Sequence, residues 1–208
     1  MRRLVLLLTV LVEAACSGLR SSAPATQTYL LRAAQAQAAP AAAKPSAPSL
    51  QVARPEPGPG LGSEHIVIVQ PDHRMSYFAG SQWAAELPLV VEALAVERLR
   101  SSGAWQAVND SESAFSSEYF MQITIRRFEA EYATDAAPTA YVALDCAIGR
   151  RSDRLLVASF TAQGEAPASA NRVGAVVAAF ERAANAALAQ LAESSVAAVR
   201  SLQAPSNP

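Results

Sequence analysis

The chain has 208 residues, of which 51% are hydrophobic and 17% charged, with a formal net charge of -1. This composition suits one modest core in one or at most two domains, and it excludes a collagen, a multi-span membrane protein and a wholly disordered chain. Seventeen basic against eighteen acidic residues, without a dense basic run, leave little to neutralise a phosphate backbone, so we expect no nucleic-acid partner. With only two histidines and two cysteines, we also expect no metal site and no other cofactor.

The first sixteen residues have the pattern of a secretory signal. Arg2 and Arg3 form a short basic segment, residues 4–12 are an apolar run, and two alanines precede Cys16. We therefore predict a signal peptide over residues 1–15. Small residues directly before a cysteine also fit the lipobox of a bacterial lipoprotein, which makes Cys16 the predicted lipid attachment site. Glu13 departs from the lipobox pattern, and the alternative is ordinary signal-peptidase cleavage that releases a soluble protein.

The segment after Cys16 is poor in large apolar residues. Residues 16–26 have the composition of a tether, and residues 28–31 predict a short strand. Residues 33–49 are almost entirely Ala, Gln and Pro, which predicts a disordered insertion, with a frayed helix over 33–39 as the alternative. Residues 54–60 predict a stiff loop, because three prolines fix φ and two glycines allow tight bends.

The next segment combines strands with a helix. Residues 65–70 and 74–79 are rich in β-branched and aromatic side chains and predict two strands joined by a turn at Pro71. The apolar period then becomes helical over residues 82–101, and Pro88 should kink this helix or mark a restart close to it. The predicted apolar stripe of the helix consists of Trp83, Leu87, Val90 and Leu94.

Strands dominate the following part. Residues 105–109 predict a short strand, and residues 118–131 a long one with a bulge at Arg127-Phe128. Cys146 falls on one face of the next strand, where it should pack as a small apolar side chain with Val142, Leu144 and Ile148. A turn over residues 149–153 leads to its hairpin partner over 154–162.

From Ser169 onward the period is helical again. A long helix is predicted, followed by a loose tail over residues 200–208. Its apolar stripe consists of Val173, Val177, Phe180, Ala184, Ala187 and Leu191. The order of elements predicts one α/β (α+β) domain with a mixed or largely antiparallel sheet and two helices packed on one face.

The sequence contains no pattern typical of catalysis. There is no GxSxG, HExxH, CxxC or P-loop motif in the chain. His65 and His73 are isolated and are interpreted as surface or packing residues, and Asp135, Asp145 and Asp153 lack the spacing of an acid/base pair. We therefore expect that the protein is not an enzyme.

A contact surface is the remaining type of site. A rigid loop is a common contact element, so its residues are candidates for a partner interface, together with two nearby aromatic residues. For Trp83 the favoured interpretation is a core anchor, and the alternative is partial exposure close to Tyr77. The candidate interface residues are Pro55, Pro57, Gly58, Pro59, Gly60, Tyr77 and Trp83.

Several short motifs follow one another in an order that resembles a known family. They are Tyr29-Leu30-Leu31, Leu50-Gln51-Val52, Gly60-Leu61 to Ile66-Val67, Arg74-Met75-Ser76-Tyr77, Gln82-Trp83-Ala84 with Leu87, Phe120-Met121-Gln122-Ile123 with Phe128-Glu129, and Val176-Val177-Ala178-Ala179-Phe180. Their order behind a signal peptide resembles the PqiC-like auxiliary lipoproteins of MCE-type ABC transporters. The resemblance covers about residues 27–199 and implies one auxiliary lipoprotein domain over this range.

The resemblance also implies a function. It implies a periplasmic lipoprotein that contacts an MCE-domain protein and assists the transport of phospholipid or another hydrophobic substrate between the inner and outer membranes. Ser17 follows the lipidated cysteine in place of the Asp that retains lipoproteins in the inner membrane, so we expect attachment to the outer membrane through Cys16. The alternative is a stand-alone structural or assembly lipoprotein of the cell envelope without a role in transport.

Overall fold

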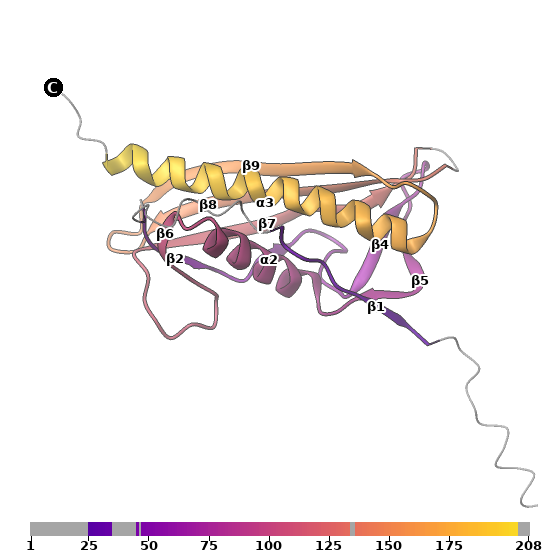
Figure 1. Ribbon diagram of the computed structural model, residues 1–208, viewed down its shortest axis with the longest axis horizontal. Coiled ribbons are helices and arrows are strands. Elements are labelled where there is room, and N and C mark those ends of the chain that lie inside the picture. The colour runs from indigo at the N-terminus through magenta and orange to yellow at the C-terminus, as the bar shows by residue number, and fades with distance from the viewer. Residues whose placement is uncertain (1–24, 35–44, 46, 134–135, 204–208) are drawn as a thin grey trace, which may run out of the picture.

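The structure is a computed structural model that describes residues 25–34, 45, 47–133 and 136–203 (Figure 1). The predicted signal peptide, Cys16, Asp135 and residues 204–208 lie outside the described residues. The strands are β1 (Gln27–Tyr29), β2 (Ala47–Val52), β3 (Glu56–Pro57), β4 (His65–Val69), β5 (Met75–Trp83), β6 (Trp105–Asn109), β7 (Tyr119–Glu131), β8 (Thr139–Arg150) and β9 (Leu156–Pro167). The helices of the described part are α2 (Leu87–Ser101) and α3 (Val173–Gln203).

Strand β7 joins the whole sheet together. One of its edges pairs with β8 along its full length, in antiparallel orientation, and β8 pairs in turn with β9. The other edge receives β2, β3 and β4 one after another, all parallel to β7. Strand β6 extends the sheet beyond β2, while β5 and β1 extend it beyond β4. The nine strands therefore form one open, mixed sheet within a single α+β domain, as predicted.

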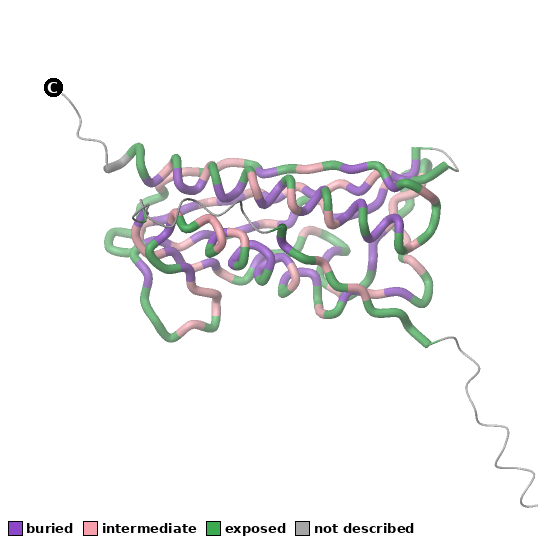
Figure 2. The backbone as a smooth tube through the Cα atoms, viewed as in Figure 1, coloured by how far each residue is buried: buried purple, intermediate pink, exposed green. Residues whose placement is uncertain are grey.

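Both helices lie on the same face of this sheet. Helix α3 runs along β8 and β9, and α2 lies beside it over the short strands (Figure 1). Buried and exposed residues follow the helical period along α3, because one side of the helix faces the sheet and the other faces solvent (Figure 2). At Gly164 of β9, a Cβ atom would lie 2.2 Å from the carbonyl oxygen of Ala183, so the missing side chain allows helix and strand to approach.

The core contains an aromatic cluster between sheet and helices. Trp83 from the end of β5 meets Phe128 edge to face, with ring centroids 6.0 Å apart, and Phe180 at 5.3 Å. The rings of Phe128 and Phe180 are stacked at 5.2 Å. All three side chains are buried, and their mutual contacts connect β5, β7 and α3.

Two predicted elements differ in extent from those observed. The predicted insertion over residues 33–49 overlaps β2, because Ala47 is buried and pairs with Trp105. The N–H of Ala34 donates to Oδ1 of Asn185 at 2.6 Å, so the start of the insertion is also in contact with α3. Residues 35–44 lie outside the described part of the chain.

The first helix begins later than predicted. Strand β5 continues to Trp83, and α2 starts only at Leu87, with Pro88 in its first turn. This position suits proline, because the first N–H groups of a helix have no partner within it. The predicted restart near Leu87 is therefore confirmed, whereas residues 82–86 are not helical and Trp83 is buried from a strand.

The strand predictions in the second half of the chain are confirmed. The register of β7 against β8 shifts between Ile125 and Arg127, which is the predicted bulge displaced by one residue. Val142, Leu144, Cys146 and Ile148 are all buried on the helix side of β8. Strand β9 is longer than predicted and ends at Pro167, and the last helix begins at Val173 and includes residues 201–203.

Candidate functional site

A cavity between sheet and helices in the described part of the chain is too small to hold a ligand. The cavity between sheet and helices has a volume of about 10 Å³ and is lined by apolar side chains of α2, α3, β7 and β8. One water molecule needs roughly 10–15 Å³. An acyl chain does not fit into this space, and the larger hollows lie on the surface.

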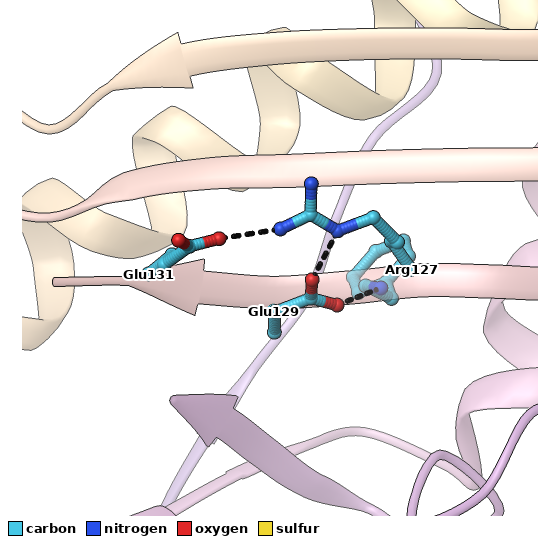
Figure 3. A network of polar contacts seen from close by, with 4 residues as sticks. Arg127, Glu129 and Glu131 are labelled. Atoms are coloured by element: carbon cyan, nitrogen blue, oxygen red, sulfur yellow. Dashed lines mark hydrogen bonds and ion pairs between the residues drawn. The ribbon is translucent and has the colours of Figure 1, made fainter. Parts of the chain in front are cut away.

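The sheet face opposite the helices carries a charged network (Figure 3). Nε of Arg127 donates to Oε1 of Glu129 at 2.5 Å, and its Nη2 donates to Oε2 of Glu131 at 2.5 Å. The side chain of Glu129 is only 11% exposed, and its Oε2 accepts the N–H of Phe128 at 2.7 Å. The guanidinium group of Arg127 also lies over the ring of Tyr141, 4.3 Å from its centroid. The Arg127 side chain is thus already engaged by two carboxylates and one aromatic ring.

The pKa of Arg127 reflects these contacts. Burial lowers it, but hydrogen bonds and attraction to Glu129 and Glu131 more than offset the burial, so the pKa is raised above its ordinary value. The Arg127 guanidinium group therefore remains charged over the whole physiological pH range. We interpret it as a structural element of the open face.

A hollow of about 510 Å³ lies further along the same strands, between them and the segment that follows β2. Asp145 is its central acidic group: Oγ1 of Thr161 donates to Oδ1 of Asp145 at 2.8 Å, and Nη1 of Arg126 lies 3.3 Å from its Oδ2. Arg54 and Glu56 line the other side. The charges in this hollow are of both signs, and Asp145 already has two partners.

Cys146 borders the same hollow but does not present its thiol to it. The residue is 2% exposed, and burial, with a smaller contribution from Asp145, raises the pKa of the Cys146 thiol to about 12. A protonated thiol is neither a nucleophile nor a metal ligand at neutral pH. Cys146 therefore packs as a core residue, as predicted.

A neighbouring hollow of about 530 Å³ shares Ala53 and Arg54 with the first one. Its other lining residues are Gln51, Ser111, Phe120, Arg151 and Arg154. A third hollow of about 710 Å³ lies beside α2 and is rich in carboxylates, with Glu92, Glu97, Asp110 and Glu112 in its lining. The surface thus separates an arginine-rich hollow from an acidic one.

The predicted stiff loop over residues 54–60 is part of the folded sheet and not a freely exposed contact loop. Glu56 and Pro57 form β3 against β7, and the N–H of Gly58 donates to the carbonyl of Ile125 at 2.9 Å. Leu61, at the end of the loop, is buried. The segment predicted as a stiff loop over residues 54–60 therefore includes a strand, β3, which fills the edge of β7 between β2 and β4.

Of the two aromatic candidates, one is exposed and one is buried. Tyr77 is 45% exposed, and its ring lies 4.7 Å from that of His65. Trp83 is only 1% exposed and belongs to the core, so the favoured interpretation of this residue is supported. Met75 connects the loop with Tyr77, because a Cβ atom on Gly60 would lie 2.5 Å from Sδ of Met75. Gly60, Met75 and Tyr77 thus form one exposed area, which we call the β5 patch.

The remaining candidates lie apart from one another. His73 has a φ of 64° in the turn between β4 and β5, and Asp153 pairs with Arg150 at 2.6 Å in the turn between β8 and β9. Within the described residues, no three His, Cys, Asp or Glu side chains are close enough together to hold a metal ion. No helix in the described part of the chain is long and apolar enough to cross a membrane.

The sequence prediction missed the arginine residues. The spacing of Arg127, Glu129 and Glu131 is a signal that could have revealed the network, because alternate residues of a strand point to the same face. The arginine-rich turn at residues 150–154 was a second signal. The distant Arg54 joins this turn only through the pairing of β2 with β7, which the sequence pattern does not show.

The fold defines the class of protein to which this chain can be compared: a single α+β domain with a filled core and surface hollows. A crystal structure of a Xanthomonas campestris protein of the family-model DUF330 is similar, with a TM-score of 0.74 and 26% identity, and the match covers 85% of this chain and 99% of that one. A second crystal structure, of an uncharacterized protein, shares the fold with a TM-score of 0.64 and 14% identity over 82% of this chain and 99% of that chain. The comparison with curated proteins gives no match.

The comparison with family models identifies one family. The model for the ABC-type transport auxiliary lipoprotein component matches residues 29–192. The chain belongs to this family. The resemblance seen in the sequence is therefore confirmed at the level of the family, and membership implies association with the cell envelope and with an ABC transporter.

Proposed function

We propose that this protein is the auxiliary lipoprotein of an MCE-type ABC transporter. In this role it is attached to the outer membrane through Cys16 and assists the movement of phospholipid or another hydrophobic substrate between the two membranes. The match to the auxiliary lipoprotein family over residues 29–192 carries the proposal. The filled core supports a role in binding a partner rather than in enclosing a lipid, and we propose no catalytic activity.

The proposed partner is a periplasmic MCE-domain protein, contacted through the folded domain. The β5 patch is the surface we assign to this contact, because Met75 and Tyr77 are 47% and 45% exposed and lie on one strand. Tyrosine and methionine are enriched at protein interfaces. This patch replaces the complete Pro55 to Gly60 loop as the candidate interface, since β3 is needed to complete the sheet.

Co-purification tests this proposal. The tagged full-length chain is solubilised from membranes, and the MCE-domain protein encoded beside it should be retained. Tyr77→Ser should reduce its retention, while Phe115→Ser, an aromatic change at a more exposed position beyond the opposite end of β7, should not. If the folded protein retains no MCE-domain protein, the alternative of a stand-alone structural lipoprotein is favoured.

The lipid anchor has its own test. Cells are labelled with an alkyne fatty acid, and the wild-type protein should incorporate the label while Cys16→Ser should not. Fractionation of the labelled membranes should place the protein in the outer membrane. A wild-type protein without label, or a labelled Cys16→Ser variant, would contradict lipidation at Cys16.

A further inference from the structure

Three arginines gather at the end of the sheet where β7 begins. Arg54 follows β2, and Arg151 and Arg154 belong to the turn between β8 and β9; together they line the hollow of about 530 Å³ over Phe120. We call this hollow the arginine pocket. Its volume lies within the range of about 300–1,000 Å³ that is typical of small-molecule sites.

Arg151 is held in a fixed orientation. Its Nε donates to the carbonyl of Ser117 at 3.0 Å, and its Nη2 donates to Oε1 of Gln51 at 2.6 Å. The guanidinium carbon lies 5.9 Å from the centroid of the Phe120 ring. The two hydrogen bonds use one edge of the planar guanidinium group, and the N–H groups of Nη1 on its other edge are available to a ligand in the pocket.

Arg154 has an unusual backbone conformation. Its φ is 58°, in the left-handed region that favours glycine and asparagine. Its exposed side chain has no hydrogen-bond or ion-pair partner in the part of the chain that the structure describes. A strained residue with an unused charged side chain is typical of a functional position.

The charge of the pocket distinguishes it from the other two hollows. Among the described residues no carboxylate lines it, whereas Glu56 and Asp145 line the first hollow and four carboxylates line the one beside α2. Of the three arginines, only Arg54 has an acidic partner in the described part of the chain: Glu86, at 3.0 Å and in an exposed pair. Arg151 and Arg154 have no compensating carboxylate among the described residues and add to the positive charge of Arg54, so a bound anion would stabilise the pocket.

We propose that the arginine pocket binds a phosphate group, that of a glycerophospholipid headgroup or free inorganic phosphate. Guanidinium groups bind phosphate oxygens in pairs, and three of them from two segments can surround one phosphate. Leu155 and Phe115, exposed by 57% and 77% in the two loops beside the pocket, provide apolar surface for the rest of a lipid. The phosphate site follows from the pocket alone, and the assignment of a lipid as its source rests on the proposed transport function.

Native mass spectrometry of the full chain, purified in detergent and free of phosphate, tests the site. The probes are inorganic phosphate, phosphatidylglycerol and diacylglycerol, which has the same acyl chains but no phosphate. We expect adducts with phosphatidylglycerol and none with diacylglycerol. An adduct with inorganic phosphate alone assigns the free anion as the source, and equal binding of diacylglycerol, or no phosphate-bearing adduct at all, overturns the proposal.

The variants separate binding from folding. Arg154→Gly should weaken phosphate binding by about tenfold to a hundredfold, the factor expected for one charged hydrogen-bonding partner. Because glycine suits a φ of 58°, the melting temperature of the Arg154→Gly variant should not fall. Arg172→Gln removes the same charge beyond the opposite end of β9 and should bind as the wild type does. If both variants weaken phosphate binding equally, the assignment of the binding site to the arginine pocket is overturned.

A last comparison separates this proposal from the proposed function. Arg154→Gly should still retain the MCE-domain protein, because the β5 patch lies toward the other end of β7. If Arg154→Gly loses this protein and the wild type shows no phosphate adduct, the arginines bind acidic side chains of the partner. That result would overturn the phosphate site and leave the transport role in place.

Discussion

At the scale of single residues, Cys146 shows how completely the sheet and helices exclude water. Its side chain is 2% exposed, and its pKa of about 12 keeps the thiol protonated. We expect the native protein to resist maleimide and to react with it after denaturation. Rapid labelling of the native protein at neutral pH would show that β8 presents its other face to the core.

The same thiol gives a pH dependence of stability. Its pKa is raised on folding from 9.0 to about 12, so the folded state holds the proton more tightly. This contribution is fully present below pH 9 and is lost as the pH rises from 9 toward 12. Between pH 9 and 11, the free energy of unfolding should therefore fall more steeply for the wild type than for Cys146→Ala. Parallel pH profiles from urea titrations would contradict the assigned pKa.

Glu129 is the residue of the open face whose loss should matter most. Glu129→Ala removes two hydrogen-bond acceptors from the N–H groups of Arg127 and Phe128. We expect a destabilisation of about 1–3 kcal/mol in urea unfolding. Arg126→Ala breaks only the exposed pair with Asp145 and should cost about 0–1 kcal/mol. An equal loss of unfolding free energy in both variants would show that the buried hydrogen bonds of Glu129 do not contribute to stability.

At the scale of elements, the contact between β9 and α3 depends on Gly164. A side chain there would meet the backbone of α3 at Ala183, and backbone cannot move aside as a side chain can. We expect Gly164→Val to destabilise the protein by about 1–3 kcal/mol through overpacking. Gly174→Ala, where a Cβ atom meets nothing within 4 Å, should be neutral or stabilising by up to about 1 kcal/mol. Thermal unfolding of both variants, with circular dichroism as readout, tests the contact.

Elements with a clear apolar period could be predicted from the sequence. The stripe of α3 is buried except for the half-buried Val173, and the bulge of β7 was found within one residue. The boundary of α2 was missed because Trp83 continues the helical spacing of the stripe by coincidence, although it ends a strand. β3 was missed because its two residues, Glu56 and Pro57, have no strand signal and pair only where β7 offers an edge.

At the scale of the whole molecule, β7 determines which parts unfold together. It pairs with four other strands, and its residues toward the helices are buried. We expect its amide hydrogens to exchange only through global unfolding, whereas those of the three-residue edge strand β1 exchange through local opening. Hydrogen exchange followed by mass spectrometry should therefore give the slowest peptides in β7. Faster exchange in β7 than in β1 would contradict its central role.

The arginine pocket lay beyond sequence analysis for the same topological reason. Each arginine has an ordinary surface position in the sequence, and only the parallel pairing of β2 with β7 brings Arg54 to the turn that contains Arg151 and Arg154. Such pairings join segments far apart in the chain, and local patterns contain no information about them. The fold class was accessible from the order of elements, whereas the juxtaposition that forms the pocket was not.

The position of β7 in the chain also affects how the protein is made. Strands β2, β3 and β4 precede their common partner, and Leu50 pairs with Tyr119, roughly seventy residues later. As the chain emerges from the ribosome or from a translocation pore, these strands have open edges until β7 has followed them. Unpaired strand edges are prone to aggregation, so the emerging chain is a natural client for chaperones until residue 131 is free. A premature stop before Tyr119 would release a fragment that has most of the strands of this half of the sheet and none of the strand that joins them.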